Sequence, residues 1–167
     1  MQRFQNIDLI KSQGFKGFYT IKALTKNISL IPEEPGVYFI LYMADVKPVF
    51  IDIGTGGHFK GRNPNVVTEV LRDNWIETTK VIYMGKAGGP GSIATLKSRL
   101  KQYIKFGQGS NVGHWGGRYI WQIENSNDLI ICWKTLPKNI DPRKIETDYL
   151  QQFKSIYGKR PFANLVD

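Results

Sequence analysis

Gly36-Val37-Tyr38 and Tyr83-Met84-Gly85 each stand where a strand pattern meets a turn signal. The first string opens residues 35–43, a run of β-branched and aromatic side chains that predicts a strand. The second string closes a shorter predicted strand, 80–84, and is followed at once by Lys86. The two strings therefore supply a pair of strand tyrosines, one of them close to a lysine.

A helix is predicted at 93–106 from its apolar periodicity, and Ser92 is a suitable N-cap for it. Arg99 and Tyr103 lie four residues apart on the flank of the apolar face. Arg99 has two interpretations. It is a surface arginine whose stem packs on that face, or its planar guanidinium is held toward a phosphate, whose oxygens it matches.

A second helix is predicted from Asp141, an N-cap that a proline follows, to Tyr157. Glu146 shares a stripe of this helix with Leu150 and Phe153. A carboxylate at the edge of an apolar stripe is costly to bury without a partner. Glu146 therefore has two interpretations. It forms an ion pair or is exposed at the edge of the stripe, or it binds a metal ion.

Shorter patterns predict the remaining elements. They are a helix near 20–25, a strand at 48–53, a helix at 66–75, and a pair of strands at 119–123 and 129–136 joined by a polar turn. The basic and aromatic string 15–19 is expected to pack over the sheet rather than to contact a ligand.

The order and local context of these features resemble the GIY-YIG nuclease family. Gly36-Val37-Tyr38 matches the first family element and Tyr83-Met84-Gly85 the second, each with one hydrophobic exchange. The resemblance covers residues 35–165. It implies a metal-dependent endonuclease that hydrolyses phosphodiester bonds with Mg²⁺, for which Mn²⁺ substitutes, on DNA in preference to RNA. The catalytic residues that it implies are Tyr38, Tyr83, Lys86, Arg99, Tyr103, Glu146 and Asn164.

In this resemblance, Tyr83 helps to activate the attacking water, Lys86 assists it or contacts the phosphate, and Tyr38 positions the water or the phosphate. A free phenol has a pKa near 10, so a nearby cation is needed to favour its ionised form. Without the resemblance, each tyrosine would be interpreted as a strand residue packed with its hydroxyl at the rim.

The resemblance also places Arg99 at the scissile phosphate and gives Tyr103 an orienting or phosphate-contacting role. Glu146 would be the metal ligand, and a single carboxylate is enough because Mg²⁺ completes its shell with phosphate and water. Asn164 would support the site by hydrogen bonding, a role compatible with stabilising its own turn.

The fold expected is α/β of the α+β type, with a small, mainly antiparallel central sheet flanked by helices. One domain is expected over 1–167, made of an N-terminal extension, 1–32, packed on a nuclease-like domain, 33–167. In the family the two motif strands are joined by a short turn. Here an insertion of about 44–79 separates them, and it either covers the core or reads the substrate.

Composition sets limits on function. The chain has 167 residues, 41% of them hydrophobic, and a formal net charge of +9, which favours a polyanionic partner. No apolar run is long enough to span a bilayer, and 1–11 lacks a signal-peptide pattern, so no membrane partner is expected. The single cysteine, Cys132, suits a reducing cytoplasm.

Four further residues are candidate nucleic-acid contacts: His114, Trp115, Arg118 and Lys97. Trp115 would stack on a base or pack within its loop. A nucleic-acid-binding module with little or no cleavage activity is the alternative function. Cutting both strands would call for a homodimer or for two successive nicks.

Overall fold

The computed structural model describes residues 3–166 as an α+β fold, in which helices pack on a four-stranded antiparallel sheet. The predicted fold class is therefore confirmed, while residues 1, 2 and 167 of the predicted domain lie outside the described residues. The strands are β1 (Lys16–Thr20), β2 (Gly36–Leu41), β3 (Val81–Ala87) and β4 (Ile130–Thr135). The helices are α1 (Ile7–Lys11), α2 (Ile21–Lys26), α3 (Thr68–Asn74), α4 (Leu96–Gly107) and α5 (Pro142–Tyr157).

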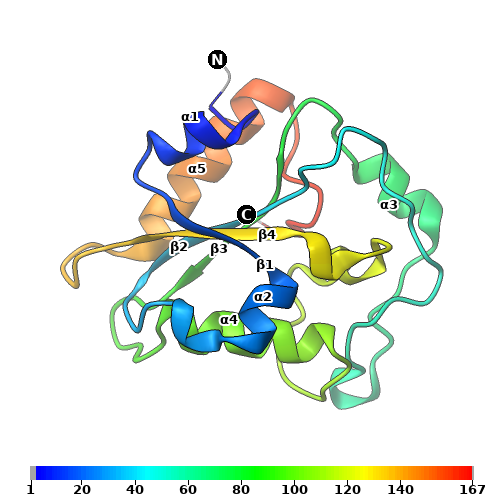
Figure 1. The fold of residues 1–167 in the computed structure, drawn as a ribbon, viewed down its shortest axis with the longest axis horizontal. Coiled ribbons are helices and arrows are strands. Elements are labelled where there is room, and N and C mark those ends of the chain that lie inside the picture. Colours follow the sequence, from blue (N-terminus) through cyan, green and yellow to red (C-terminus); the bar gives the residue numbers. More distant parts are fainter. Residues whose placement is uncertain (1–2, 167) are drawn as a thin grey trace.

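The sheet lies between two layers of helix, with α1 and α5 on one face and α2 and α4 on the other (Figure 1). Alternation along β2 builds both layers, because successive strand side chains point to opposite faces. Val37 and Phe39 join the apolar cluster beneath α5, and Tyr38 and Ile40 join the one above α4. All six residues of β2 are buried, as expected for a central strand covered on both sides.

The strand order is β1-β4-β2-β3, so β3 is an edge strand that pairs only with β2. Tyr38 lies opposite Gly85, and Ile40 opposite Tyr83. The two sequence strings therefore lie side by side, although the connection 42–80 separates them. This connection is closed at its base, where the Tyr42 amide donates to the Lys80 carbonyl over 2.9 Å.

The N-terminal segment supplies part of the sheet and part of the core. The string 15–19, expected to pack over the sheet, instead forms most of β1, which pairs antiparallel with β4. Phe18 has φ 62° where the register of this pair shifts, so the strand carries a bulge there. Phe4 and Ile10 are buried in the apolar cluster that also contains Leu150 and Phe153 of α5.

Two predicted strands are wrong. Residues 48–53 form only an isolated bridge, between Phe50 and Ile123. Residues 119–123 lie mostly in a 3₁₀-helix, Arg118–Gln122, which starts after Gly117 in the left-handed conformation (φ 77°). The Gln122 side chain accepts a hydrogen bond from the Val66 amide and donates one to the Val66 carbonyl, so it binds the connection where a strand neighbour was expected.

The predicted start of α4 was three residues too early. Thr95 is the N-cap, and it forms a capping box with Ser98, each side chain accepting from the other residue's amide. Ser92 accepts instead from the Ala94 amide within the preceding loop, and Ile93 is fully exposed. The predicted helices near 20–25, at 66–75 and at 141–157 are present as α2, α3 and α5, with small differences at their ends.

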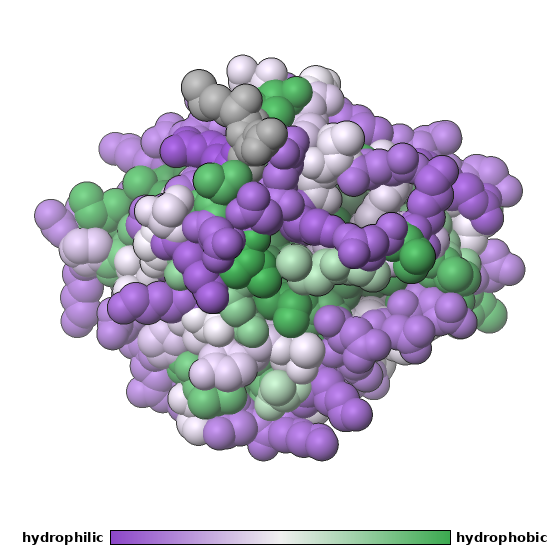
Figure 2. Space-filling view, turned by 45° about the horizontal axis from the view of Figure 1, so that its top comes forward, coloured by the Kyte–Doolittle hydropathy of each residue, from purple (hydrophilic) through white to green (hydrophobic). Residues whose placement is uncertain are grey.

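The surface in Figure 2 is largely hydrophilic, with more hydrophobic residues gathered in a band across the middle of that face. Among the described residues, no helix combines the length and the apolar character that crossing a bilayer requires.

Phe39 is the centre of the aromatic cluster beneath α5, with Phe15, Tyr149 and Phe4 at ring-centre distances of 4.2, 5.2 and 6.1 Å. We expect Phe39→Ala to lower the free energy of unfolding by about 3–5 kcal/mol, because it leaves a cavity that these rings cannot fill. Urea unfolding measures this change. Val46→Ala, at a 71% exposed position, is the control and should change stability by less than about 0.5 kcal/mol.

Candidate active site

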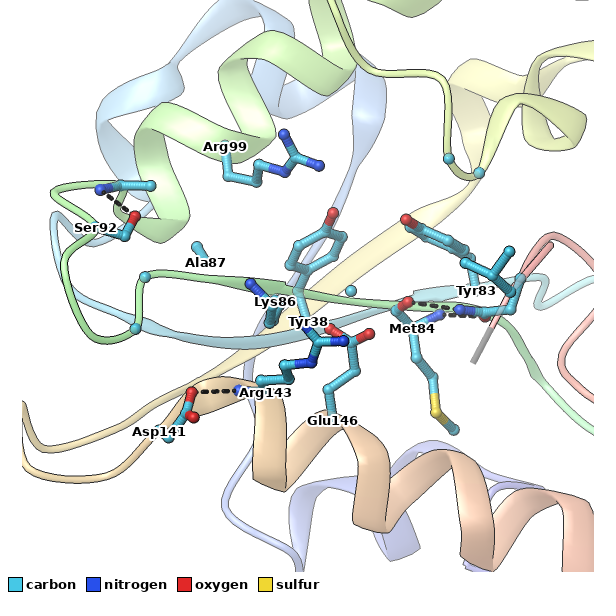
Figure 3. Close-up of a pocket in the computed structure, with 18 of the residues that line it drawn as sticks. Tyr38, Tyr83, Met84, Lys86, Ala87, Ser92, Arg99, Asp141, Arg143 and Glu146 are labelled. Atoms are coloured by element: carbon cyan, nitrogen blue, oxygen red, sulfur yellow. Dashed lines mark hydrogen bonds between the residues drawn. The ribbon is translucent and has the colours of Figure 1, made fainter.

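An open cleft of about 620 Å³ lies at the outer edge of β3. Six of the seven catalytic residues predicted from the sequence line it: Tyr38, Tyr83, Lys86, Arg99, Glu146 and Asn164. Arg99 reaches in from α4, Glu146 rises from α5, and the strand residues lie between them (Figure 3). The seventh, Tyr103, lies behind the cleft, where its ring stacks on that of Tyr83 with ring centres 5.7 Å apart.

The cleft is built around a strand edge. By alternation, Tyr83 faces α4 while Met84 and Lys86 face α5. Ile82 and Met84 use outward-facing backbone groups to bind the segment that follows α5, so the amide of Lys86 also points outward. Side chains from both faces of the sheet therefore meet around the outer edge of β3. The backbone amide of Lys86, a hydrogen-bond donor, lies between them.

Gly85 allows Tyr38 to reach this edge. A Cβ atom at Gly85 would lie 2.3 Å from Cζ of Tyr38 and 2.4 Å from its hydroxyl oxygen, so only glycine fits beneath the ring. The phenol of Tyr38 thus lies across the backbone of β3, toward the cleft. Gly85 is the last residue of the second sequence string, and this close approach is the physical reason for a glycine there.

Asn164 binds the outer edge of β3 as a neighbouring strand would. Its side-chain oxygen accepts from the Met84 amide and its side-chain nitrogen donates to the Met84 carbonyl, both over 2.9 Å. The adjacent Ala163 amide donates to the Ile82 carbonyl. Asn164 is therefore a positioning residue in this structure, because it fixes the backbone between Tyr83 and Gly85.

The three tyrosines form a buried stack. Burial raises the pKa of Tyr83 to about 12, to which the charge of Glu146 adds, while the Arg99 guanidinium acts in the opposite sense. Burial, followed by the neighbouring Tyr83, also raises the pKa of Tyr38 well above its ordinary value. Both phenols are therefore protonated at neutral pH in the protein alone. The Tyr103 hydroxyl donates to the Gly117 carbonyl over 2.8 Å.

Glu146 is a half-buried carboxylate without a close partner. Burial raises its pKa, and the charges of Lys86, Arg143 and Arg99 oppose this rise. Within residues 3–166 it forms no ion pair within 4 Å and accepts no hydrogen bond. Three cations thus surround the carboxylate without pairing with it, and its oxygens remain free to bind a ligand.

Arg143 is the lining residue that the sequence analysis missed. It lies one turn before Glu146 on α5, and its side chain extends beside the Glu146 carboxylate (Figure 3). The spacing of three residues on one helix face was the available signal. Asp141, the N-cap of α5, also lines the cleft, but its side chain accepts from the Arg143 amide over 3.0 Å.

The donor set fits a metal ion only in part. No group of three or more His, Cys, Asp or Glu side chains in the described residues is arranged to hold a metal. The unpartnered oxygens of Glu146 fit an ion that takes one protein carboxylate and completes its shell with phosphate and water, as Mg²⁺ does. A metal at this site would therefore depend on the bound substrate for most of its ligands.

The candidate nucleic-acid contacts lie in different surroundings. Lys97 forms an ion pair with Glu33 over 3.2 Å. Trp115 and Arg118 contact each other at the edge of the cleft, with the guanidinium carbon 4.7 Å from the ring centre. His114 is 1% exposed and packs on Tyr103 at a ring-centre distance of 4.3 Å, so a direct contact with nucleic acid would require the ring to leave this position.

In comparisons with known proteins, no family model, no curated protein and no solved structure matches the chain.

We expect Glu146→Gln to be more stable than the wild type at about pH 8 in EDTA. Because burial raises the pKa of Glu146, the folded protein binds this proton more tightly than the unfolded chain, so the ionised carboxylate destabilises the fold at high pH. The difference should shrink as the pH falls through the raised pKa. Urea unfolding across pH measures it, with the exposed Asp148→Asn as control. A less stable variant at high pH would show that the surrounding cations outweigh burial.

His114 predicts a loss of stability in acid. Burial, with the Arg99 charge adding to it, lowers the pKa of His114 from 6.5 to about 3. The unfolded chain therefore binds a proton that the folded protein excludes, and stability falls as the pH drops from about 6.5 toward 3, by about 1.4 kcal/mol per pH unit. His114→Phe keeps the contact with Tyr103 and should remove this part of the slope. An unchanged slope in urea unfolding would contradict the burial of a neutral ring.

Proposed function

We propose that this protein is a metal-dependent endonuclease of the GIY-YIG type that hydrolyses phosphodiester bonds in DNA. The supporting observation is that six residues chosen by sequence resemblance, spread from Tyr38 to Asn164, line one cleft. The cations around Glu146 and the net charge of +9 agree with a polyanionic substrate.

The proposed reaction is the attack of water on phosphorus. The bond between phosphorus and the leaving oxygen breaks, the water gives up a proton and the leaving oxygen takes one up. Arg99 would hold the scissile phosphate from the α4 side through its planar donors. Glu146 would hold Mg²⁺ from the α5 side, and Mg²⁺ supplies charge that stabilises the negative charge developing on the phosphate and leaving oxygen.

Tyr83 and Lys86 would lie on either side of the water. Since the pKa of Tyr83 is about 12, its phenol first orients the water by hydrogen bonding. It could accept the proton of the water only as the phenolate, after added positive charge in the substrate complex has lowered this pKa and the phenolic proton has passed to solvent. Tyr38, held over Gly85, would position the phosphate or the water, and Tyr103 would hold the Tyr83 ring by stacking.

A cytoplasmic location and a homodimer that cuts both strands are parts of the same proposal. The single Cys132 is a buried free thiol, which agrees with a reducing compartment. The dimer is proposed only because one cleft carries one set of catalytic side chains and so cuts one strand at a time.

The test is cleavage of supercoiled plasmid by the wild type, by Glu146→Gln and by Asp148→Asn. Asp148 is exposed on the same helix and does not line the cleft. We expect nicking or linearisation with Mg²⁺ or Mn²⁺, none in EDTA, a loss of at least about a hundredfold in Glu146→Gln, and unchanged cleavage in Asp148→Asn.

Two results would count against the proposal. Equal cleavage by the wild type and Glu146→Gln would mean that the metal-ligand role is wrong or that the activity belongs to a contaminant. A wild type that retards DNA on a gel but cuts nothing with either metal would favour the alternative function, a nucleic-acid-binding module.

A further inference from the structure

Trp115 holds two guanidinium groups beside the candidate active site. The guanidinium carbons of Arg62 and Arg118 lie 4.6 and 4.7 Å from the centre of its ring, and Arg118 also lies 5.4 Å from the ring centre of Tyr119. Contacts of this kind are favourable for arginine, whose flat and weakly hydrated group stacks on aromatic faces. Two like charges are thereby brought close to one point.

No acidic group of the described residues balances these charges. Within residues 3–166, neither guanidinium forms an ion pair or a side-chain hydrogen bond. Burial lowers the pKa of Arg118, Tyr119 opposes this shift, and the nearby charge of Arg62 adds a smaller lowering. Arg118 is half-buried and Arg62 is exposed. An anion close to both would offset the repulsion between their like charges.

Trp115 and Arg118 flank two glycines of the cleft wall. Gly116 and Gly117, between Trp115 and Arg118 in the chain, both line the cleft. Gly117 packs directly on the Tyr83 ring, because a Cβ atom there would lie 2.8 Å from Cζ of Tyr83. Arg118 is therefore one residue from a backbone segment that contacts a proposed catalytic tyrosine.

Arg62 comes from the connection 42–80, which is hydrogen-bonded to the end of α4 and to the loop that follows it. The Gly57 amide donates to the Phe106 carbonyl over 2.8 Å, and the Lys60 amide donates to the side-chain oxygen of Asn111 over 3.2 Å. These bonds hold the segment that carries Arg62 near the loop that carries Trp115 and Arg118. Such preorganisation reduces the entropy lost when a ligand binds.

We propose that Arg62, Trp115 and Arg118 form a second phosphate-binding site, which holds a backbone phosphate of the nucleic-acid strand whose scissile phosphate lies in the cleft. This inference rests on the proposed function. Phosphates follow one another every 3.4 Å along the axis of each strand, so a site beside the cleft meets a phosphate near the one being cut. The connection 42–80 would then be a substrate-binding element, and Trp115 would orient arginines in place of stacking on a base.

The test is binding of a short DNA duplex in EDTA, measured between about 50 and 200 mM salt. We expect Arg62→Ala and Arg118→Ala each to weaken binding about tenfold and to reduce the slope of log K against log salt by about 0.9, because each loses one phosphate contact. Trp115→Ala should weaken binding by a similar factor. Arg72→Ala, on α3 of the same connection, is the control and should keep the wild-type slope.

Arg118→Lys is a second variant, which controls for the possibility that an alanine variant fails to fold. It keeps the charge but loses the planar group that stacks on the Trp115 ring. It should bind more weakly than the wild type and have an unchanged unfolding temperature. The inference is overturned if the two alanine variants bind with the wild-type affinity and slope, or if Arg72→Ala weakens binding as much as they do, since the effect is then one of net charge.

The outcomes separate this inference from the proposed function. A wild type that cuts plasmid, with Arg62→Ala and Arg118→Ala binding like the wild type, leaves the nuclease proposal standing and removes the second site. A wild type that cuts nothing, with weaker binding and a reduced slope in those variants, supports the phosphate site and removes the nuclease activity.

Discussion

The register of β2 against β3 is the constraint on which the candidate site depends. It sets Tyr38 opposite Gly85. Only glycine, which has no Cβ atom, leaves room for the phenol of Tyr38 to cross to the strand edge. A shift of one residue would turn Tyr38 toward α5 and put a side chain beneath its ring. Burial on both faces prevents this shift, since Phe39 and Ile40 would exchange clusters. The packing of the core and the geometry of the site therefore have one cause.

Charge is distributed unevenly around this edge. Lys86, Arg99 and Arg143 lie near a single carboxylate, Glu146, and none of them forms an ion pair with it among the described residues. A structural ion-pair network would have drawn the partners together. An arrangement that keeps cations apart around one carboxylate is suited to a ligand that brings its own negative charge. The buried phenols add donors to this centre without adding charge at neutral pH.

The sequence predicted the elements whose signals are local. The strand at 35–43 and the helix from Asp141 were predictable because β-branched runs, an N-cap and a proline act within a few residues. Residues 119–123 have the composition of a strand, but Gly117 starts a 3₁₀-helix there and Gln122 binds a distant loop. The edge strand β1 was missed as a strand because lysine, glycine and a left-handed Phe18 obscure its pattern.

The candidate site also has parts that the sequence predicted and parts that it did not. Resemblance chose residues that line one cleft, but it did not indicate Arg143, which only the helix face places beside Glu146. The meaning of Gly85 depends on the register, and the contact between Arg62 and Trp115 depends on how two loops pack. Contacts made across long stretches of chain leave no local signal, so they become visible only in the structure.

The connection 42–80 has a consequence for how the protein folds. Leu41 and Val81 are paired neighbours, so β2 and β3 cannot form as a local hairpin and must close a long loop before their hydrogen bonds form. Helices such as α4 and α5 rely on contacts within a turn and form much faster. We therefore expect a refolding chain to gain helix first and the Tyr38–Gly85 crossing late.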